Sequence, residues 1–430
     1  MRLRYIYLFL LLLFTSAILK SQNILSLEEA IQTAKKENLN IDMTKMQAQL
    51  ADMQVYRANA GLTPRLDWNT AFNGSGNFVN QTFFDGRSIN RLGRTLAPST
   101  NLALSYTIYD GNRGKTRLSL LQAQADRSHM MIEGIEEAVE FDVVQTYLDI
   151  AKQKSTIAYL NKTISFYKER MDITEERWIV GRGSKLDFLQ SQNDMNAQKA
   201  ALTNAKALLQ SLKQYMNLLL NRDANTDFDV DETPPSSNLY SADEMLAMAI
   251  ENDENLKLIK QDRIINDLRK TELKGAKLPL VNLNSTFGYS LSNSNAGLLL
   301  LNQNLGLNAG VTASWNIYDG NNINTQIKIN EFQNNVLDKQ QNLEVENLKN
   351  RIAVAIYQWE NAKSLLELES TNKAIAEENL TISLEKFRLG GSTILEVNEA
   401  QRRYDDAQFR HVNAFYGVKY AELALEMIIK

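Results

Sequence analysis

The side chains that could do covalent or metal chemistry are scarce in this chain. Among its 430 residues there is no cysteine, and His129 and His411 are the only histidines. Without cysteine there is no thiolate nucleophile and no cysteine-ligated zinc, and two histidines poorly supply a metal site or a Ser-His relay. We expect both histidines on helix surfaces, with no metal and no cofactor bound. The chain is therefore not expected to be an enzyme.

Nucleotide and nucleic-acid chemistry is no better supported. The sequence contains no G-x-x-x-x-G-K-[ST] phosphate-binding loop. Its formal net charge is −4, so no excess of positive charge favours nucleic acid as a partner. Apolar residues make up 44% of the chain, enough for a packed core, and only 5 prolines and 19 glycines occur. So few helix breakers leave room for long uninterrupted helices.

The N-terminus has the layout of a secretory signal peptide. Arg2 and Arg4 precede an apolar run over 5–19. This run is short for a membrane span, and a basic start before it is typical of a cleaved leader. We therefore assign 1–22 to a signal peptide and expect the protein to be exported. No second apolar run of 18 residues follows, so no transmembrane helix is expected in the mature chain.

The rest of the sequence is an internal duplication with an offset near 209 residues. We assign the copies to 23–221 and 241–430, and interpret 222–240, with its Pro-Pro-Ser-Ser and acidic residues, as an equatorial linker. The repeated motifs are Tyr109-Asp110-Gly111 with Tyr318-Asp319-Gly320, and Gly181-Arg182-Gly183-Ser184 with Gly390-Gly391-Ser392-Thr393. The Tyr-Asp-Gly motifs are interpreted as turns between a strand and a helix, without a catalytic role.

Each copy is predicted to contain a helix, two strands, a long helix and a shorter helix. The long helices are predicted over 116–178 and 325–388, where there is no proline and Gly134 is the only glycine. Apolar side chains recur there every three or four residues, and helices of about 90–95 Å must pack against others along their length. A coiled-coil-like bundle is implied. The first helices are predicted over about 34 residues from the capping-box serines Ser26 and Ser241, and the shorter helices over 185–220 and 394–429.

Four segments alternate between apolar and polar residues: 65–73, 101–108, 281–289 and 305–317. Alternation with period two predicts half-buried strands of about ten residues. Aromatic side chains toward the strand ends and a Gly/Asn/Ser face favour a membrane-barrel wall over a soluble sheet. The Asn/Gly/Ser-rich segments 73–99 and 290–304 are interpreted as outer loops. Because four strands cannot close a barrel and lipid tolerates no open edge, several chains must pool their strands.

With its tandem copies, paired Tyr-Asp-Gly turns and paired Gly/Ser tips, the chain from about Leu25 to Lys430 resembles the TolC family of outer-membrane efflux proteins. The resemblance implies a mainly α fold with β, in which long coiled-coil hairpins form an α-barrel. Each chain of a homotrimer would add four strands to a twelve-stranded membrane β-barrel. The implied protein is an export channel in the outer membrane of a Gram-negative bacterium, extending into the periplasm.

The resemblance also implies partners: a periplasmic adaptor (membrane fusion protein), an inner-membrane pump and outer-membrane lipid. The alternative is a periplasmic coiled-coil adaptor or scaffold, which would also contain long hairpins and short β segments. The alternating strands and the Asn/Gly/Ser-rich segments favour the channel.

The same resemblance assigns roles to the loops between the long and the shorter helices, which form the periplasmic tips where an adaptor docks. The glycines there are first of all turn residues with permissive backbone angles, and an adaptor contact would add to that role. The best-known family members have a basic residue at the position of Ser392, which ties the second tip to the first. Arg182 and Lys185 are the candidates for that tie here. The adaptor-contact residues assigned in this way are Gly181, Arg182, Gly183, Ser184, Lys185, Gly390, Gly391, Ser392 and Thr393.

Glu396 and Glu399 match the acidic pair that lines the periplasmic aperture in this family, and Asp187 stands at the equivalent place in the first copy. Because they are three residues apart, the two glutamates are expected to share one helix face. A structural role is the alternative. Ser184-x-x-Asp187 and Thr393-x-x-Glu396 both fit a helix-capping box, and Glu399 also fits an ordinary solvated helix charge.

Overall fold

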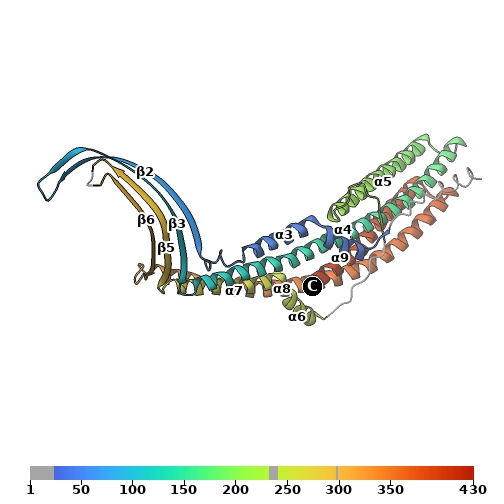
Figure 1. Cartoon of the computed structure of the whole chain (residues 1–430). Helices are drawn as coiled ribbons and strands as arrows, with labels where there is room; N and C mark the ends of the chain where they lie inside the picture. The colour runs from blue at the N-terminus through green and yellow to red at the C-terminus, as the bar shows by residue number, and fades with distance from the viewer. Residues whose placement is uncertain (1–23, 232–240, 297–298) are drawn as a thin grey trace, which may run out of the picture. The chain divides into compact units, whose positions relative to one another are not determined.

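The computed structural model describes residues 24–231, 241–296 and 299–430 (Figure 1). The predicted signal peptide and residues 232–240 of the predicted linker lie outside them. The elements are β1 (Ile24–Leu25), α2 (Leu27–Glu37), α3 (Leu39–Gln54), β2 (Arg65–Thr82), β3 (Ser88–Tyr109), α4 (Arg113–Ile179), α5 (Lys185–Leu219), β4 (Asp229–Val230), α6 (Ala242–Asn252), α7 (Glu254–Gly275), β5 (Leu280–Ser294), β6 (Leu301–Ser314), α8 (Asn322–Arg388) and α9 (Ile394–Ile429). In this part of the chain, no helix combines the length and apolar character needed to cross a membrane.

The predicted long helices are confirmed, but the first helix of each copy is broken. The helices α4 and α8 each contain 67 residues. A single first helix of about 34 residues was a wrong prediction, because Asn38 separates α2 from α3 and Asp253 separates α6 from α7. The Asn38 side chain accepts a bond from the amide of Asn40 at 2.9 Å, and the Asp253 carboxylate accepts one from Leu256 at 2.8 Å. These short polar side chains compete with the helical backbone and cap the next helix instead.

The capping serines behave as predicted at the start of the second copy. The Ser241 hydroxyl accepts a bond from the Glu244 amide at 3.3 Å, and the Glu244 carboxylate accepts one from the Ser241 amide at 2.9 Å. This is a complete capping box, which satisfies two amides that the first turn leaves unpaired. At the start of the first copy, Ser26 accepts a bond from the Glu29 amide at 3.2 Å.

Two compact units make up the described chain, and each takes segments from both copies of the duplication. The helical unit comprises the described residues of 24–45, 131–256 and 343–430. The strand unit comprises 46–130 and those of 257–342. The duplication is therefore a repeat of sequence and element order, whereas the packing units cut across it.

The strand unit contains one antiparallel sheet with the order β2-β3-β5-β6 (Figure 1). Its register places Leu102 opposite both Trp68 and Phe287, and Leu307 opposite Phe287, so one apolar row crosses all four strands. These side chains are not covered within the chain, since Trp68 is 76% exposed and Leu307 is 67% exposed. The alternate residues are polar, as in the pair Asn69–Asn101. The predicted two-faced strands are thus present.

The strands are longer than the predicted ten residues. They contain 18, 22, 15 and 14 residues in chain order. The prediction of an outer loop over 73–99 was wrong, because β2 and β3 pair as a hairpin up to Thr82 and Ser88. Most of 290–304 likewise belongs to β5 and β6. Gly, Asn and Ser are typical of loops by composition, but backbone pairing to an adjacent strand holds these residues extended.

The helical unit is held by buried apolar contacts between helices of both copies. One core contains Val143, Tyr147 and Ile150 of α4 together with Met216 of α5 and Tyr416 of α9. A second core lies nearer the ends of the hairpins and joins Ile173 of α4 to α8 and α9, with Leu380, Leu384, Phe387, Val397, Ala400 and Tyr404. The coiled-coil packing that the apolar spacing predicts is therefore observed within this unit.

Candidate functional site: the hairpin tips and the strand-to-helix turns

The first hairpin tip is a tight turn between α4 and α5 that two glycines make possible. Gly181 has φ +73°, a left-handed conformation that closes the end of α4, and the Arg182 amide donates to the Arg177 carbonyl at 2.8 Å. A Cβ on Gly183 would lie 2.9 Å from the Cβ of Arg177. Gly181 is therefore required for its backbone angle, and Gly183 for the close approach of the loop to α4.

The second tip, between α8 and α9, repeats this geometry. Gly390 has φ +86°, and the Gly391 amide donates to the Lys386 carbonyl at 2.8 Å. A Cβ on Gly391 would meet nothing closer than 3.7 Å. The backbone of the two tips is thus equivalent, but glycine is needed at two positions of the first tip and at one position of the second.

The caps of α5 and α9 differ from each other. The Thr393 hydroxyl accepts a bond from the Glu396 amide at 3.3 Å, as the capping pattern predicts. The Ser184 hydroxyl instead accepts a bond from Leu186 at 3.0 Å, so the predicted pairing with the Asp187 amide is wrong. Asp187 remains in the first turn of α5, where a carboxylate interacts favourably with the helix dipole.

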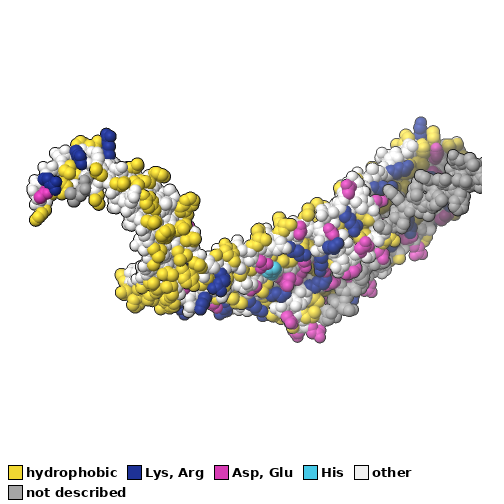
Figure 2. Space-filling model, viewed as in Figure 1, with side chains coloured by type: hydrophobic (Ala, Val, Ile, Leu, Met, Phe, Trp, Pro, Cys, Tyr) yellow, Lys and Arg dark blue, Asp and Glu magenta, His cyan; other side chains and the backbone are white. Residues whose placement is uncertain are grey.

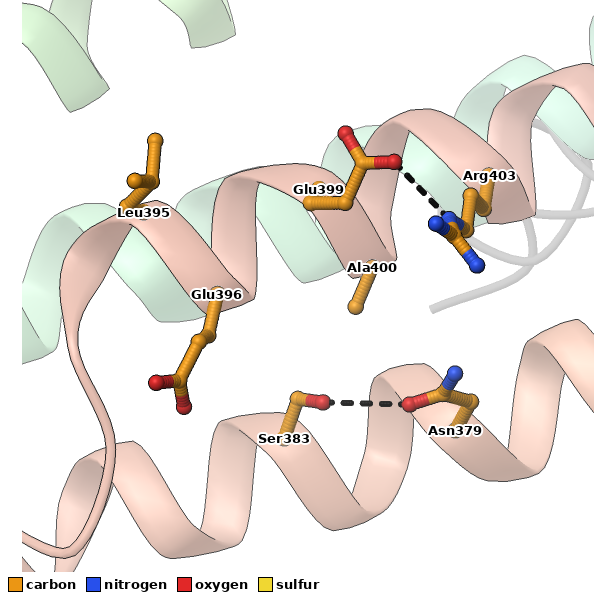
Figure 3. Close-up of a pocket in the computed structure, with 7 residues that line it drawn as sticks. All are labelled: Asn379, Ser383, Leu395, Glu396, Glu399, Ala400 and Arg403. Carbon is orange, nitrogen blue, oxygen red and sulfur yellow. Dashed lines mark hydrogen bonds and ion pairs between the residues drawn. The ribbon is translucent and has the colours of Figure 1, made fainter.

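Glu396 and Glu399 both line a cleft of about 460 Å³ between α8 and α9 (Figure 3). Their carboxylates point in different directions in Figure 3, although both residues border the same cleft. Glu396 accepts a bond from the Ser392 hydroxyl at 2.7 Å, which lowers the pKa of this exposed carboxyl. Glu396 is therefore ionised at neutral pH, and its nearest partner is uncharged.

Glu399 is paired with cations of its own helix. It accepts bonds from the guanidinium groups of Arg403, at 2.8 Å, and Arg402. Both hydrogen bonds lower the pKa of Glu399, and the one from Arg403 has the larger effect. Two positive charges thus surround one negative charge, and this part of α9 has no net negative charge to present.

The tie between the two tips is made by residues other than the predicted ones. Lys185 lies over the Trp178 ring of its own hairpin, 5.3 Å from the centroid, and Arg182 is exposed. Arg177 reaches the second hairpin, where it donates to the Phe387 carbonyl at 2.8 Å and lies over the Phe387 ring at 4.3 Å. In the other direction, Arg388 of α8 forms an ion pair with Glu169 of α4. The assignment of this tie to Arg182 or Lys185 was therefore wrong.

A buried cluster of polar side chains surrounds Arg170 and is called the node below. It was not found from the sequence. Arg170 of α4 has a side chain only 2% exposed, and it binds both Asp194 of α5 and Asn398 of α9. Its guanidinium lies 5.0 Å from the ring centroid of Tyr167, whose hydroxyl donates to Asp405 at 2.8 Å. Burial raises the pKa of Asp405, and this effect outweighs the hydrogen bonds that it accepts, which lower the pKa. The node joins three helices from both copies.

The two Tyr-Asp-Gly motifs form matching turns at the start of the long helices. The Asp110 carboxylate accepts a bond from the Gly114 amide at 2.6 Å, and Asp319 accepts one from Ile323 at 2.8 Å. Both glycines have a left-handed backbone, with φ +72° at Gly111 and +69° at Gly320. The motif therefore caps α4 and α8. Tyr109 is 41% exposed and Tyr318 is 82% exposed, and neither lies in a buried site.

The histidines have no metal-like surroundings in the described residues. His129 Nε2 lies 2.9 Å from the Asp52 carboxylate, in a half-exposed pair on the strand unit's helices. Burial lowers the pKa of His411. Within the described ranges, no group of three or more His, Cys, Asp or Glu side chains could hold a metal ion.

Long coiled hairpins joined to strands with one exposed apolar face define the class of protein: an outer-membrane channel. The family model described as "Outer membrane efflux protein" matches residues 30–222 and 274–429, and the chain belongs to this family. The outer membrane efflux protein BepC of Brucella suis biovar 1 (strain 1330) is 22% identical over 419 residues, which cover 96% of this chain and 87% of BepC.

Solved outer-membrane proteins have the same fold. VceC of Vibrio cholerae superimposes with a TM-score of 0.71 at 14% identity, covering 94% of this chain and 95% of VceC. The CmeC channel of Campylobacter jejuni gives a TM-score of 0.75 at 14% identity, covering 94% of this chain and 85% of CmeC. The crystallised channel protein CusC also gives 0.75, at 15% identity and with coverages of 94% and 91%.

These findings confirm the predicted TolC-type family, the fold class and the location in the outer membrane with an extension into the periplasm. The protein is an outer-membrane efflux channel component, and its family consists of transport channels rather than of enzymes. The alternative of a periplasmic adaptor or scaffold is therefore set aside.

Proposed function

We propose that three copies of this chain form one export tunnel, in which each copy contributes four strands to a twelve-stranded barrel. The observation that carries the proposal is the open sheet. In the order β2-β3-β5-β6, the outer strands β2 and β6 each pair on one side only. An unpaired strand edge is not tolerated in lipid, and membrane barrels need about eight strands or more. Pooled chains satisfy both conditions by joining β2 of one copy to β6 of the next, and three copies give the proposed twelve strands.

Native mass measurement of the detergent-solubilised protein tests this assembly. We expect the mass of three chains, with resistance to dissociation because the strand edges are joined by backbone hydrogen bonds. A folded monomer that remains inserted in membranes would contradict the pooling of strands, and an inserted dimer would contradict the proposed number of three chains.

The hairpin tips are the proposed contact with a periplasmic adaptor, through which an inner-membrane pump delivers the substrate. Exposed apolar side chains flank both tip turns, and a soluble partner would cover them: Val180 is 60% exposed, Leu186 60% and Leu389 84%. The proposed contact residues are Gly181, Arg182, Gly183, Ser184, Lys185, Gly390, Gly391, Ser392 and Thr393. The chain is proposed to be organised as copies 23–221 and 241–430 around the linker 222–240.

We assign the charge at the periplasmic aperture mainly to Glu396, together with Asp187 at the equivalent place in the first tip, and give Glu399 a lesser role. The distinction comes from the partners on α9. Glu396 is held by an uncharged hydroxyl, whereas Glu399 is paired with Arg402 and Arg403. Three unneutralised carboxylates around one axis raise the local concentration of cations and repel anions.

Single-channel recording tests the aperture. We expect Glu396→Gln to lower the cation selectivity in a planar bilayer and to weaken block by a trivalent cation by about tenfold. This is the order of effect expected when a ring of like charges is removed from a narrow passage. Glu399→Gln is the matched control one turn away and should change both quantities far less. Equal effects of the two substitutions would contradict the distinction, and no effect of either would place both carboxylates outside the aperture.

A further inference from the structure

Charged residues of the sheet are concentrated at one end of one hairpin. The segment 278–318, which contains β5 and β6, has no Asp, Glu, Lys or Arg. Within 65–109, an Arg65–Asp67 ion pair lies where β2 begins. Figure 2 shows the remaining Lys and Arg side chains of this sheet over the far end of the β2–β3 hairpin. The charged residues there are Asp85, Arg87, Arg91 and Arg94, three cations for one anion.

Two of the three arginines have no acidic partner. Arg87 is paired with Asp85 in the turn of the hairpin, with its Nε 2.7 Å from the carboxylate. Arg91 and Arg94 are exposed, and in the described ranges neither forms an ion pair. The end of the hairpin therefore presents positive charge that the chain itself does not neutralise.

Arg94 lies on the apolar face of the sheet, and Arg91 lies on the polar face. The register places Arg94 opposite Gly76. Residues two apart in a strand share a face, so Arg94 stands between Leu92 and Leu96, which are 42% and 55% exposed. Leu92 is in turn opposite Phe78, which is 87% exposed. This arginine is the one charged side chain of β3 on the exposed apolar face of the sheet.

The height of Arg94 along the strand corresponds to the lipid headgroups of the outer leaflet. Fourteen residues separate it from Ile108, where β3 approaches the turn into α4. At about 3.3 Å per residue and a tilt near 40°, this is about 35 Å along the membrane normal. The apolar band of a membrane barrel is about 25 Å tall. Arg94 thus lies above the band, where an arginine on the outer wall costs about 0–1 kcal/mol rather than the 2–4 kcal/mol of the midplane.

The backbone at Arg94 is fixed, and its side chain has room. The Arg94 amide donates to the Asn295 side-chain oxygen at 2.6 Å, and the Asn295 amide donates to the Arg94 carbonyl at 3.2 Å. Gly76, opposite Arg94, has nothing within 4 Å of where its Cβ would be. The guanidinium is therefore carried by an ordered strand and meets no bulky neighbour across it.

We propose that Arg94 binds a phosphate group of a phosphorylated glycolipid in the outer leaflet, the class of lipid to which lipid A belongs. A guanidinium matches phosphate with two parallel hydrogen bonds, and Leu96, two residues nearer the membrane than Arg94, would contact the acyl chains of the same lipid. The positive excess at this end of the hairpin complements the negative charge of such headgroups. Arg91 faces the other side of the sheet and is not part of the site.

Lipid binding can be measured by native mass spectrometry of the purified full-length protein, titrated with bis-phosphorylated lipid A. We expect Arg94→Gln to weaken the binding about fivefold, the change that corresponds to about 1 kcal/mol for one basic residue at an anionic membrane surface. Arg94→Lys should retain most of the binding, because it keeps the charge. Arg91→Gln, on the same strand and the opposite face, is the matched control and should leave the binding unchanged.

Two further arms identify the ligand. Lipid A from which the phosphates have been removed should bind to the unsubstituted protein as weakly as lipid A binds to the Arg94→Gln variant. Inorganic phosphate at an equal phosphate concentration should not displace lipid A, since it lacks the acyl chains. The proposal is overturned if Arg94→Gln binds lipid A as the unsubstituted protein does, if Arg91→Gln weakens it equally, or if the phosphates make no difference. The same spectra report the mass of the oligomer, so loss of assembly and loss of lipid are read separately.

Discussion

Gly111→Ala is expected to destabilise the protein by about 2–5 kcal/mol, whereas the same change at its duplicate, Gly320→Ala, should cost only about 1–2 kcal/mol. Both glycines are left-handed, with φ +72° and +69°, and a left-handed backbone costs an L-residue about 1–2 kcal/mol. Only Gly111 is also crowded. Its added Cβ would lie 2.3 Å from the Gly275 carbonyl oxygen, whereas nothing lies within 4 Å of the Cβ position at Gly320. Overpacking of this kind adds about 1–3 kcal/mol.

Thermal unfolding of the two variants in detergent, followed by circular dichroism, measures the difference. The two positions have the same motif and the same backbone angle, so Gly320→Ala serves as the control for the conformational cost. Equal losses of stability would mean that α7 shifts freely away from the turn. Gly111 would then be required only for its backbone angle, as Gly320 is, and not for the close approach of Gly275.

Much of the fold follows from patterns that are local in the sequence. The two helices of 67 residues are predictable because no proline interrupts them and their apolar residues recur at helical spacing. The breaks at Asn38 and Asp253 were missed because one polar residue, common inside helices, ends a helix only when its side chain finds the amides of the next one. The length of the β2–β3 hairpin was missed for a related reason: Gly, Asn and Ser indicate loops unless a partner strand is present.

At the tips too, features that are local in the sequence could be predicted and long-range contacts could not. Their turn glycines were recognised because the left-handed end of a helix is a local requirement. The pairing of Glu399 with Arg402 and Arg403 was also open to prediction, because three- and four-residue spacings on a helix bring opposite charges together. The ion pair between Glu169 and Arg388 was not, because residues 219 apart meet only through the rotation and register of two long helices.

Arg170→Ala is expected to destabilise the tip half of the helical unit by about 3 kcal/mol. Removal of one member of a buried ion pair costs about 3–5 kcal/mol, and the partial exposure of Asp194, 41%, moves the expectation to the lower end. The substitution also leaves Asn398 without its donor and Tyr167 without the cation above its ring. Arg402→Ala is the control: this arginine is 72% exposed, and loss of its surface pair with Glu399 should cost less than about 1 kcal/mol.

Hydrogen exchange separates a loss at the node from a loss of the whole fold. In Arg170→Ala, amides of α4, α5 and α9 near the node should exchange faster, while those of β2 and β3 keep their protection, because local opening follows the contacts that were removed. Arg170→Lys should behave more like the alanine variant than like the unsubstituted protein. A single ammonium cannot reproduce the planar fork that binds Asp194 and Asn398 on two different helices. If lysine restores full protection, the node needs only a positive charge and not the planar fork of arginine.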